Sequence, residues 1–347
     1  MNFNRILETV GPVTSFLAEY PVIGISPFQT LDPGLVVAVA RAGALGVLDL
    51  GSDPDAWPPA LAQVASKIPG EFGVRVPRGL AVDPSSLPAA VKVIIVPAGA
   101  PRRYQRPVLV EVTSLAEARA AEAAGAVGLI AKGSESGGEV GEETAFVLLQ
   151  RLVDSTELPI WVQGGIGLYT AAACIAGGAK GVVLDAQLAL VKESSLPQEI
   201  KAAVSAMDGS ETIVLAGHRV FSRPDLPVAK LVSPSVEEVR AMIGARKLAS
   251  DLLPVGQDGA FARPLADRFR TAGGVVKAIR RAIATQVREA RAQRALSADA
   301  PLAQKHHLRY PIFQGPMTRV SDRAAFAEAV AEGLPQCRIK ACPTTPR

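Results

Sequence analysis

Two glycine-rich segments, Gly133–Gly141 and Gly164–Gly167, contain the residue types of this sequence that could most directly do chemistry. Glycines lack a Cβ atom, so their backbone N–H groups can converge on one point, which suits a phosphate group or a flat ring. The first segment, GSESGGEVG, also carries Glu135 and Glu139. A carboxylate there could act as a base if burial raised its pKa. The segments therefore predict a site for a phosphorylated or planar ligand.

Simpler interpretations of the same residues stay open. Each glycine could do no more than make a tight turn between a strand and a helix, and Glu139 could be a loop residue that faces solvent. His218 is the one histidine of the main body that could reach such a site, and it could equally be structural. The three cysteines and the pair His306-His307 lack metal-ligand spacing, so no metal site is predicted.

Short apolar runs precede both segments and recur along the chain. Gly128–Ala131, Ile160–Gln163 and Gly181–Leu184 alternate with helix-length segments, which is typical of a parallel sheet with covered faces. Five earlier runs complete the set: Tyr20–Ser26, Ala44–Leu50, Phe72–Val76, Val93–Val96 and Val108–Val112. Eight strands that alternate with helices predict an α/β fold, a (β/α)8 TIM barrel with its site at the carboxyl ends of the strands.

Composition limits the partners. The chain has 347 residues, 48% of them hydrophobic, and a net charge of +4. Much of the positive excess lies in residues 277–294 and at the end of the chain, which we interpret as a solvated helix face, so no nucleic acid is expected. No apolar stretch reaches the roughly 18 residues of a membrane span. Three cysteines without a disulfide pattern favour a reducing environment, and we expect a cytoplasmic protein.

A family resemblance rests on three stretches: the loop 133–141, PIWVQGGIG at 159–167 and AGGAKGVVLDAQ at 176–187. They resemble the FMN-dependent barrels of the nitronate monooxygenase family, formerly called 2-nitropropane dioxygenases, a fold shared with the flavin-dependent enoyl-acyl-carrier-protein reductases. Residues 210–231 and Pro254–Gln257 extend the resemblance, which covers roughly residues 20 to 290.

The resemblance implies a non-covalent FMN whose phosphate is held by backbone amides of the last two strand loops. Gln163 would lie near the flavin ring, and Gly137 and Gly138 would give the flavin or substrate close access. The residues that the resemblance assigns to the cofactor are Gly137, Gly138, Gln163, Gly164, Gly165, Gly167 and Gly181.

The sequence departs from the family wording at three places, one of them the first strand, which reads PVIGISPF where the family prefers PIIQAPM. Glu139 stands where the family has a loop histidine. Asp185 stands where the family has a glycine near the phosphate, and its charge would repel a phosphate unless it turns away or pairs with Lys180.

Two functions follow from this resemblance. The first is an FMN-dependent oxidoreductase that acts on a small nitronate-like carbanion or an enoyl thioester, with Glu135 and Glu139 as the catalytic candidates. The second is a catalytically degenerate barrel that serves as a scaffold for an adjacent active barrel. Tandem barrels of this kind resemble modules of polyketide or polyunsaturated-lipid synthases, which raises acyl-carrier-bound substrates and neighbouring synthase domains as partners.

The stretch Tyr310–Thr318, YPIFQGPMT, repeats the start of the first barrel and carries the family's first-strand wording. We therefore predict a C-terminal helical extension and the truncated start of a second barrel. The predicted parts are a barrel (1–235), a helical extension packed on it (236–296), a linker (297–307), one strand and one helix of the second barrel (308–333), and an unstructured tail whose composition suggests a reading-frame slip (334–347).

Overall fold

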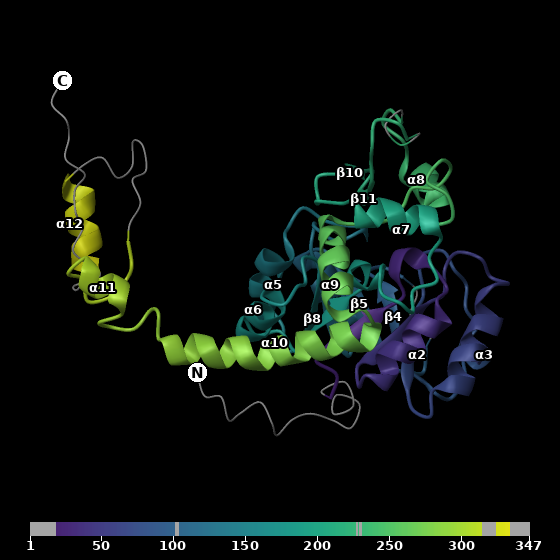
Figure 1. The fold of residues 1–347 in the computed structure, drawn as a ribbon, viewed down its shortest axis with the longest axis horizontal. Coiled ribbons are helices and arrows are strands. Elements are labelled where there is room, and N and C mark those ends of the chain that lie inside the picture. The colour runs from purple at the N-terminus through teal and green to yellow at the C-terminus, as the bar shows by residue number, and fades with distance from the viewer. Residues whose placement is uncertain (1–18, 101–103, 227, 229–230, 314–323, 334–347) are drawn as a thin grey trace. The chain divides into compact units, whose positions relative to one another are not determined.

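The computed structural model describes residues 19–100, 104–226, 228, 231–313 and 324–333. Eight parallel strands close into a barrel, which confirms the predicted fold class (Figure 1). The strands, in their order around the barrel, are β1 (Val22–Ile25), β2 (Leu45–Asp49), β3 (Phe72–Arg75), β4 (Val91–Pro97), β5 (Val108–Val112), β6 (Gly128–Lys132), β8 (Ile160–Gln163) and β9 (Gly181–Leu184). Each lies within two residues of a predicted run.

The interior of the barrel follows from the two-residue period of a strand. Alternate side chains point inward and form an apolar cluster. Its buried members are Ile23, Ile25, Leu45, Val47, Val93, Ile95, Leu109, Ile130, Trp161 and Val183.

Trp161 is the largest fully buried side chain of the barrel. Its indole nitrogen donates a hydrogen bond of 3.0 Å to the backbone oxygen of Tyr20, which precedes β1. A Cβ atom at Gly181 would lie 2.6 Å from the indole ring, and one at Gly128 would lie 3.1 Å from it. These two glycines therefore make room for the indole ring near the amino ends of the strands.

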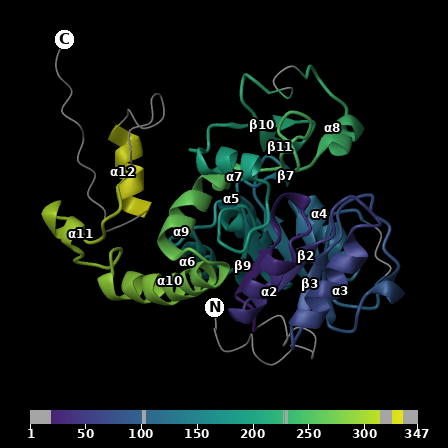
Figure 2. The same ribbon diagram turned by 45° about the vertical axis from the view of Figure 1, so that its right-hand side comes forward.

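Helices cover the outside of the barrel (Figures 1 and 2). They are α2 (Pro33–Arg41), α3 (Trp57–Lys67), α4 (Leu115–Ala123), α5 (Ala145–Val153), α6 (Thr170–Ala176) and α7 (Gln198–Ser205). Their buried residues form one large hydrophobic cluster with the outward faces of the strands, except that α7 belongs to a second cluster. Between β3 and β4 the chain has only the short 3-10 helix η3 (Pro84–Ser86), and the described residues between β4 and β5 contain no helix.

A small antiparallel sheet lies at the carboxyl end of the barrel and was not predicted in this form. It contains β10 (Thr212–Leu215), β11 (His218–Phe221) and β7 (Gly138–Glu139), in that order. The sheet, α7 and α8 (Val236–Met242) lie together in both views (Figures 1 and 2). Their buried residues pack with the 3-10 helices η2 (Pro27–Gln29) and η4 (Ala186–Leu188), and α7 and η4 contact the 3-10 helix η6 (Gln257–Phe261). Part of the segment predicted as a loop, Gly133–Gly141, is thus a strand.

The later helices are α9 (Ala262–Phe269), α10 (Ala272–Gln293), α11 (Pro301–Lys305) and α12 (Ala324–Gly333). The chain divides into two compact units, Met1–Ala284 and Thr285–Arg347, at a point within α10. Val275, Val276 and Ile279 of α10 are buried in the large cluster of the first unit. The second unit contains α11, which lies in the predicted linker, and α12. No described helix is both long and apolar enough to cross a membrane.

The predicted domain boundaries stay predictions. The tail 334–347 and most of the strand predicted at Tyr310–Thr318 lie outside the described residues, and the described part, residues 310–313, is not a strand. The helix predicted after that strand corresponds to α12.

Replacing Gly181 with alanine should destabilise the barrel. The new methyl group would lie 2.6 Å from both the indole of Trp161 and the backbone oxygen of Pro21. Overpacking of this kind costs about 1–3 kcal/mol of unfolding free energy. Urea unfolding would measure the loss. Gly70→Ala is the matched control, because a Cβ atom at Gly70 would meet nothing within 4 Å. Equal stability of the two variants would contradict the packing role of Gly181.

Candidate functional site

A layer of polar side chains lies at the carboxyl end of the barrel, directly above the apolar interior. Asp49, Arg75, Glu111, Lys132 and Gln163 end or nearly end β2, β3, β5, β6 and β8, and all five are buried. Each comes two residues after an apolar residue or a glycine of its strand that faces the barrel interior. Since side chains two residues apart point the same way, these five also face inward. In a barrel this end carries the functional site.

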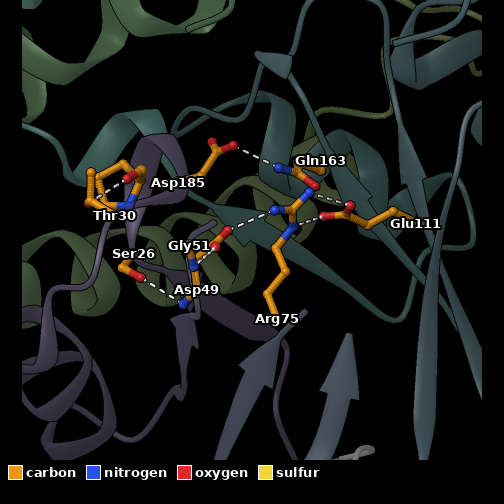
Figure 3. Close-up of polar contacts among 9 residues, drawn as sticks. Ser26, Thr30, Asp49, Gly51, Arg75, Glu111, Gln163 and Asp185 are labelled. Atoms are coloured by element: carbon orange, nitrogen blue, oxygen red, sulfur yellow. Dashed lines mark hydrogen bonds and ion pairs between the residues drawn. The ribbon is translucent and has the colours of Figure 1, made fainter. Parts of the chain in front are cut away.

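Arg75 holds the centre of this layer through two ion pairs (Figure 3). Its Nε and Nη2 atoms donate to the two carboxylate oxygens of Glu111 at 2.7 and 2.8 Å. Its Nη1 atom donates to Asp49 at 2.7 Å. The guanidinium group thus joins strands β2, β3 and β5 across the mouth of the barrel. Bidentate geometry of this kind is the strongest that arginine and carboxylate form.

The charges of the layer act on one another. Burial opposes ionisation of Glu111, but Arg75 and then Lys132 outweigh it, and its pKa is lowered to about 2. Burial raises the pKa of Asp49, although Arg75 opposes the shift. The pKa of Arg75 is raised because Glu111 and Asp49 outweigh the effect of burial. The Arg75–Glu111 pair is therefore ionised at neutral pH.

A cavity of about 30 Å³ remains at the mouth. That is room for a water molecule or two. Its lining comes from the polar layer, from the loops after β1, β6 and β9, and from Pro254: Ile25, Ser26, Phe28, Gln29, Asp49, Arg75, Lys132, Gly137, Gly138, Gln163, Asp185 and Pro254. Three residues that the sequence assigned to the cofactor, Gly137, Gly138 and Gln163, are among them.

The other assigned glycines do not line this cavity. Gly164 and Gly165 follow β8 with φ angles of 110° and 62°, in the left-handed region that glycine adopts readily. A Cβ atom at Gly164 would lie 2.6 Å from the hydroxyl of Ser136, and one at Gly165 would lie 3.3 Å from the carboxylate of Glu135. Gly164 and Gly165 therefore face the loop after β6.

Gly167 and Gly181 fit the predicted phosphate site less well. The backbone N–H of Gly167 donates to the hydroxyl of Thr170 at 2.7 Å, so this amide is already satisfied. Gly181 was placed at the wrong end of its strand: it begins β9 and packs against Trp161, whereas the site lies beyond Leu184, where β9 ends.

The two catalytic candidates have structural partners. Both carboxylate oxygens of Glu135 accept a hydrogen bond of 3.1 Å from the backbone N–H of Ala145, the first residue of α5. Glu139 accepts two hydrogen bonds from Arg78, at 3.0 and 3.1 Å, and lies 3.6 Å from Arg240. Neither lines the cavity. Their role in catalysis stays a prediction.

His218 belongs to β11 and pairs with Glu139 in the small sheet. It is buried, and burial lowers its pKa, so the ring is neutral at pH 7. No group of three or more His, Cys, Asp or Glu among the described residues could hold a metal ion.

Asp185 and Asp258 bring further carboxyl groups to the region below the Gly164–Gly167 loop. Asp185 accepts a hydrogen bond of 2.7 Å from the side-chain nitrogen of Gln163 (Figure 3). Asp258 is buried and faces the backbone N–H of Gly165 and the side chain of Gln187. Burial, then the charges of Asp185 and Glu135, raise the pKa of Asp258 well above its usual range. Asp258 is a site residue that the sequence did not single out.

Known proteins resemble this barrel in sequence. Residues 49–219 match the model of the family described as nitronate monooxygenase. The match covers just under half of the chain, and by it the barrel is similar to this family. Nitronate monooxygenases and FabK, a flavin-dependent enoyl-ACP reductase, use flavin, so this similarity supports a flavin cofactor and flavin oxidoreductase activity.

Solved structures agree. FabK from Thermotoga maritima has a TM-score of 0.67 and 26% identity, over 82% of this chain and 99% of that one. A nitroalkane oxidase from Streptomyces ansochromogenes, with a TM-score of 0.65 and 23% identity over 80% of this chain and 99% of that one, shares the fold.

One curated relative is a dehydrogenase of Rhodococcus jostii (strain RHA1), (3aS,4S,5R,7aS)-5-hydroxy-7a-methyl-1-oxo-octahydro-1H-indene-4-carboxyl-CoA dehydrogenase. It is 26% identical over 212 residues, which are 56% of this chain and 59% of that protein. The alignment therefore spans less than two thirds of the relative.

The residues at this mouth of the nitronate monooxygenase-type barrel do not fit FMN. A site for a ligand of that size needs on the order of 300 Å³ or more, and the cavity has about 30 Å³. The paired side chains of Asp49, Arg75 and Glu111 occupy the space above the barrel interior. At the predicted phosphate position, the negative charges of Asp185 and Glu135 raise the pKa of Asp258. The same charges would repel a phosphate group.

The variant Glu111→Gln tests the ion pair. It removes one carboxylate from a buried, bidentate pair and leaves part of the charge of Arg75 without a partner, which costs about 3–5 kcal/mol of unfolding free energy. The stabilisation by Glu111 is complete above its unfolded pKa of about 4.3 and is lost as pH falls toward 2. Chemical unfolding between pH 7 and 2.5 should therefore show a shallower loss of stability in the variant.

Glu122→Gln, on the exposed face of α4, is the control and should change the unfolding free energy by less than about 0.5 kcal/mol. If the two variants had the same stability at pH 7, the structural role of the Arg75–Glu111 pair would be refuted.

Proposed function

We propose that the protein is a flavin-dependent oxidoreductase of the nitronate monooxygenase and enoyl reductase type in which the described barrel is a scaffold. The observation that carries this proposal is the filled mouth. The side chain of Arg75, paired with Asp49 and Glu111, occupies the space that a flavin ring would need. The carboxyl group of Asp258 lies at the backbone N–H of Gly165, where the phosphate would bind. A barrel of the family can keep its fold after its site has changed, because the apolar layers below the mouth hold the strands together.

Flavin chemistry then belongs to an adjacent barrel. The repeated wording YPIFQGPMT at 310–318, which the sequence predicts to begin a second barrel, supports this step. We propose FMN as its cofactor and an enoyl thioester or a small nitronate-like carbanion as its substrate. The thioester is supported by FabK, an enoyl-ACP reductase, and by the carboxyl-CoA dehydrogenase of Rhodococcus jostii. An acyl-carrier-bound substrate in a polyketide or lipid synthase, in the cytoplasm, is consistent with that chemistry and stays a prediction.

The second candidate is that this barrel binds FMN and turns over substrate itself. It is favoured by the family match and by the glycines Gly164, Gly165 and Gly167, which keep the family's pattern. In that case Gln163 and Gly138 would border the ring, and Glu139 would have to leave Arg78 in order to act as a base.

The visible absorption spectrum of the purified 347-residue chain tests the two candidates. If the described barrel is a scaffold, the protein should be colourless and should not quench the fluorescence of added FMN up to about 1 mM, a dissociation constant that corresponds to only about 4 kcal/mol of binding. The filled mouth offers neither the ring space nor the phosphate amides.

A flavin band near ~450 nm that follows the protein through purification would overturn the scaffold proposal. The variant Gly165→Asp shows whether such binding uses the predicted site: it adds a carboxylate beside Glu135, and specific binding should fall at least about tenfold, equivalent to about 1.4 kcal/mol. Binding that is unchanged in this variant would lie elsewhere on the chain.

A further inference from the structure

The strand β10 is an edge of the small antiparallel sheet. It ends the order β10-β11-β7, so one of its two sides is paired within the described sheet and the other is not. Its residues, Thr-Ile-Val-Leu, are uncharged, and its pairing with β11 runs in regular register. Natural sheets usually protect an edge with a lysine, a proline or a bulge that prevents pairing with another chain. Since β10 uses none of these three devices, its edge is open to a further strand.

The backbone of β10 directs four polar groups to its unpaired side. The N–H of Ser222 in the hairpin donates to the backbone oxygen of Glu211 at 2.8 Å, so Glu211 belongs to a hydrogen-bonded pair. In an antiparallel ladder such residues alternate with residues whose N–H and C=O groups point the other way. Glu211 and every second residue after it therefore bond toward β11, whereas Thr212 and Val214 direct their N–H and C=O groups away from it.

The side chains of β10 are apolar and only partly covered. Ile213 and Leu215 pack against the hydrophobic cluster of the small sheet, yet both stay half-buried. Val214 is 49% exposed. A strand added to this edge would bury apolar surface and pair backbone groups at the same time, and both changes are favourable. The edge thus offers the two kinds of contact by which sheets bind a further strand.

We propose that β10 pairs with β10 of a second copy of this chain, antiparallel and about a two-fold axis at Ile213. In this register Thr212 lies opposite Val214 of the second copy, and Ile213 lies opposite Ile213. Each of the two Thr212–Val214 pairs exchanges two hydrogen bonds, so all the outward N–H and C=O groups of both strands are used. A two-fold interface takes the same surface from both copies, and an identical strand therefore meets every requirement of this edge.

The length and charges of β10 support this register. Because β10 has only four residues, a shift of two positions would place Thr212 or Val214 opposite a residue outside the strand. In the proposed register Glu211 lies opposite Leu215 of the second copy, so the two carboxylates do not face each other. Like charges directly opposite would destabilise the pair. His218, across the hairpin, is neutral at pH 7 and adds no repulsion.

The pairing would join two three-stranded sheets into one continuous sheet. At each end of it lies β7, which carries Gly138 of the mouth cavity and Glu139, the partner of Arg78. The sheet would therefore connect the mouths of two barrels through hydrogen-bonded backbone. The inference uses the edge of β10 alone, and it does not depend on which barrel of the protein binds flavin.

Sedimentation velocity of the 347-residue chain tests this inference. Between about 1 and 100 μM the chain should pass from monomer to dimer. Val214→Pro removes an N–H that β11 does not use, and proline is tolerated at an edge position of this kind. It deletes two of the four intermolecular hydrogen bonds, so the dissociation constant of the dimer should rise at least about tenfold. Val214→Thr keeps the N–H and the β-branched side chain, and it should change that constant less than about twofold.

The far-ultraviolet circular dichroism of both variants should match the wild type, since the pairing of β10 with β11 is kept. A chain that stays monomeric at about 100 μM leaves the edge to solvent or to an unrelated strand and overturns the proposal. A dimer that Val214→Pro does not weaken uses another surface and overturns it equally.

A cysteine pair tests the register independently. In Ile213→Cys the two new thiols face each other across the axis, at about 4.5 Å between Cα atoms, which is within the range of a disulfide. In the control Leu215→Cys they lie four residues apart along the strands, about 13 Å. After mild oxidation, peptide mass spectrometry should find at least about tenfold more disulfide between copies at position 213 than at 215, given this difference in distance. Equal amounts at both positions would refute the register. The absorption spectrum is a separate readout, so a flavin band would refute the scaffold function without deciding how β10 pairs.

Discussion

The ion pairs of Arg75 determine what the mouth of this barrel can hold. Its guanidinium group forms ion pairs with both buried carboxylates of the polar layer, Asp49 and Glu111. These pairs link strands β2, β3 and β5 across the opening. Two consequences follow. The space above the apolar interior is filled with paired side chains, and Lys132, the second cation of the layer, is left without a carboxylate of its own.

The fold itself does not depend on this layer. Below it, alternate residues of eight strands fill the barrel, and Trp161 completes the packing where Gly128 and Gly181 leave room for its ring. Outside it, the strands pack against helices in one continuous cluster. A barrel can therefore be kept while the residues at the ends of its strands change, which is why similarity to the nitronate monooxygenase family and a mouth that does not fit FMN occur in one chain.

Much of the fold could be predicted from the sequence, because buried parallel strands are apolar runs and the helices between them are periodic. The site was predicted only in part. Gln163 and Gly138 reach the cavity, but Glu111 and Lys132 were passed over, although each is a charged residue at the end of an apolar run. Counting by twos along each strand would have shown that these charges face inward together. Asp258 could not be found in this way, since it comes from a distant segment that only the tertiary fold brings to Gly165.

The packing of the glycines requires them even in a barrel that binds no flavin. A barrel freed from phosphate binding need not keep glycines for that purpose, so their presence looks like support for a flavin. The structure gives them another reason to persist. Gly137 packs directly against the backbone of Pro254, Gly256 packs against the backbone of Glu135, and a side chain at Gly164 would meet Ser136. The segment around Pro254 and Asp258 packs against the loop after β6. Because of this packing, Gly137, Gly164 and Gly256 have no room for a Cβ atom, with or without a bound phosphate. The pattern therefore indicates ancestry, and the charges around it decide the chemistry.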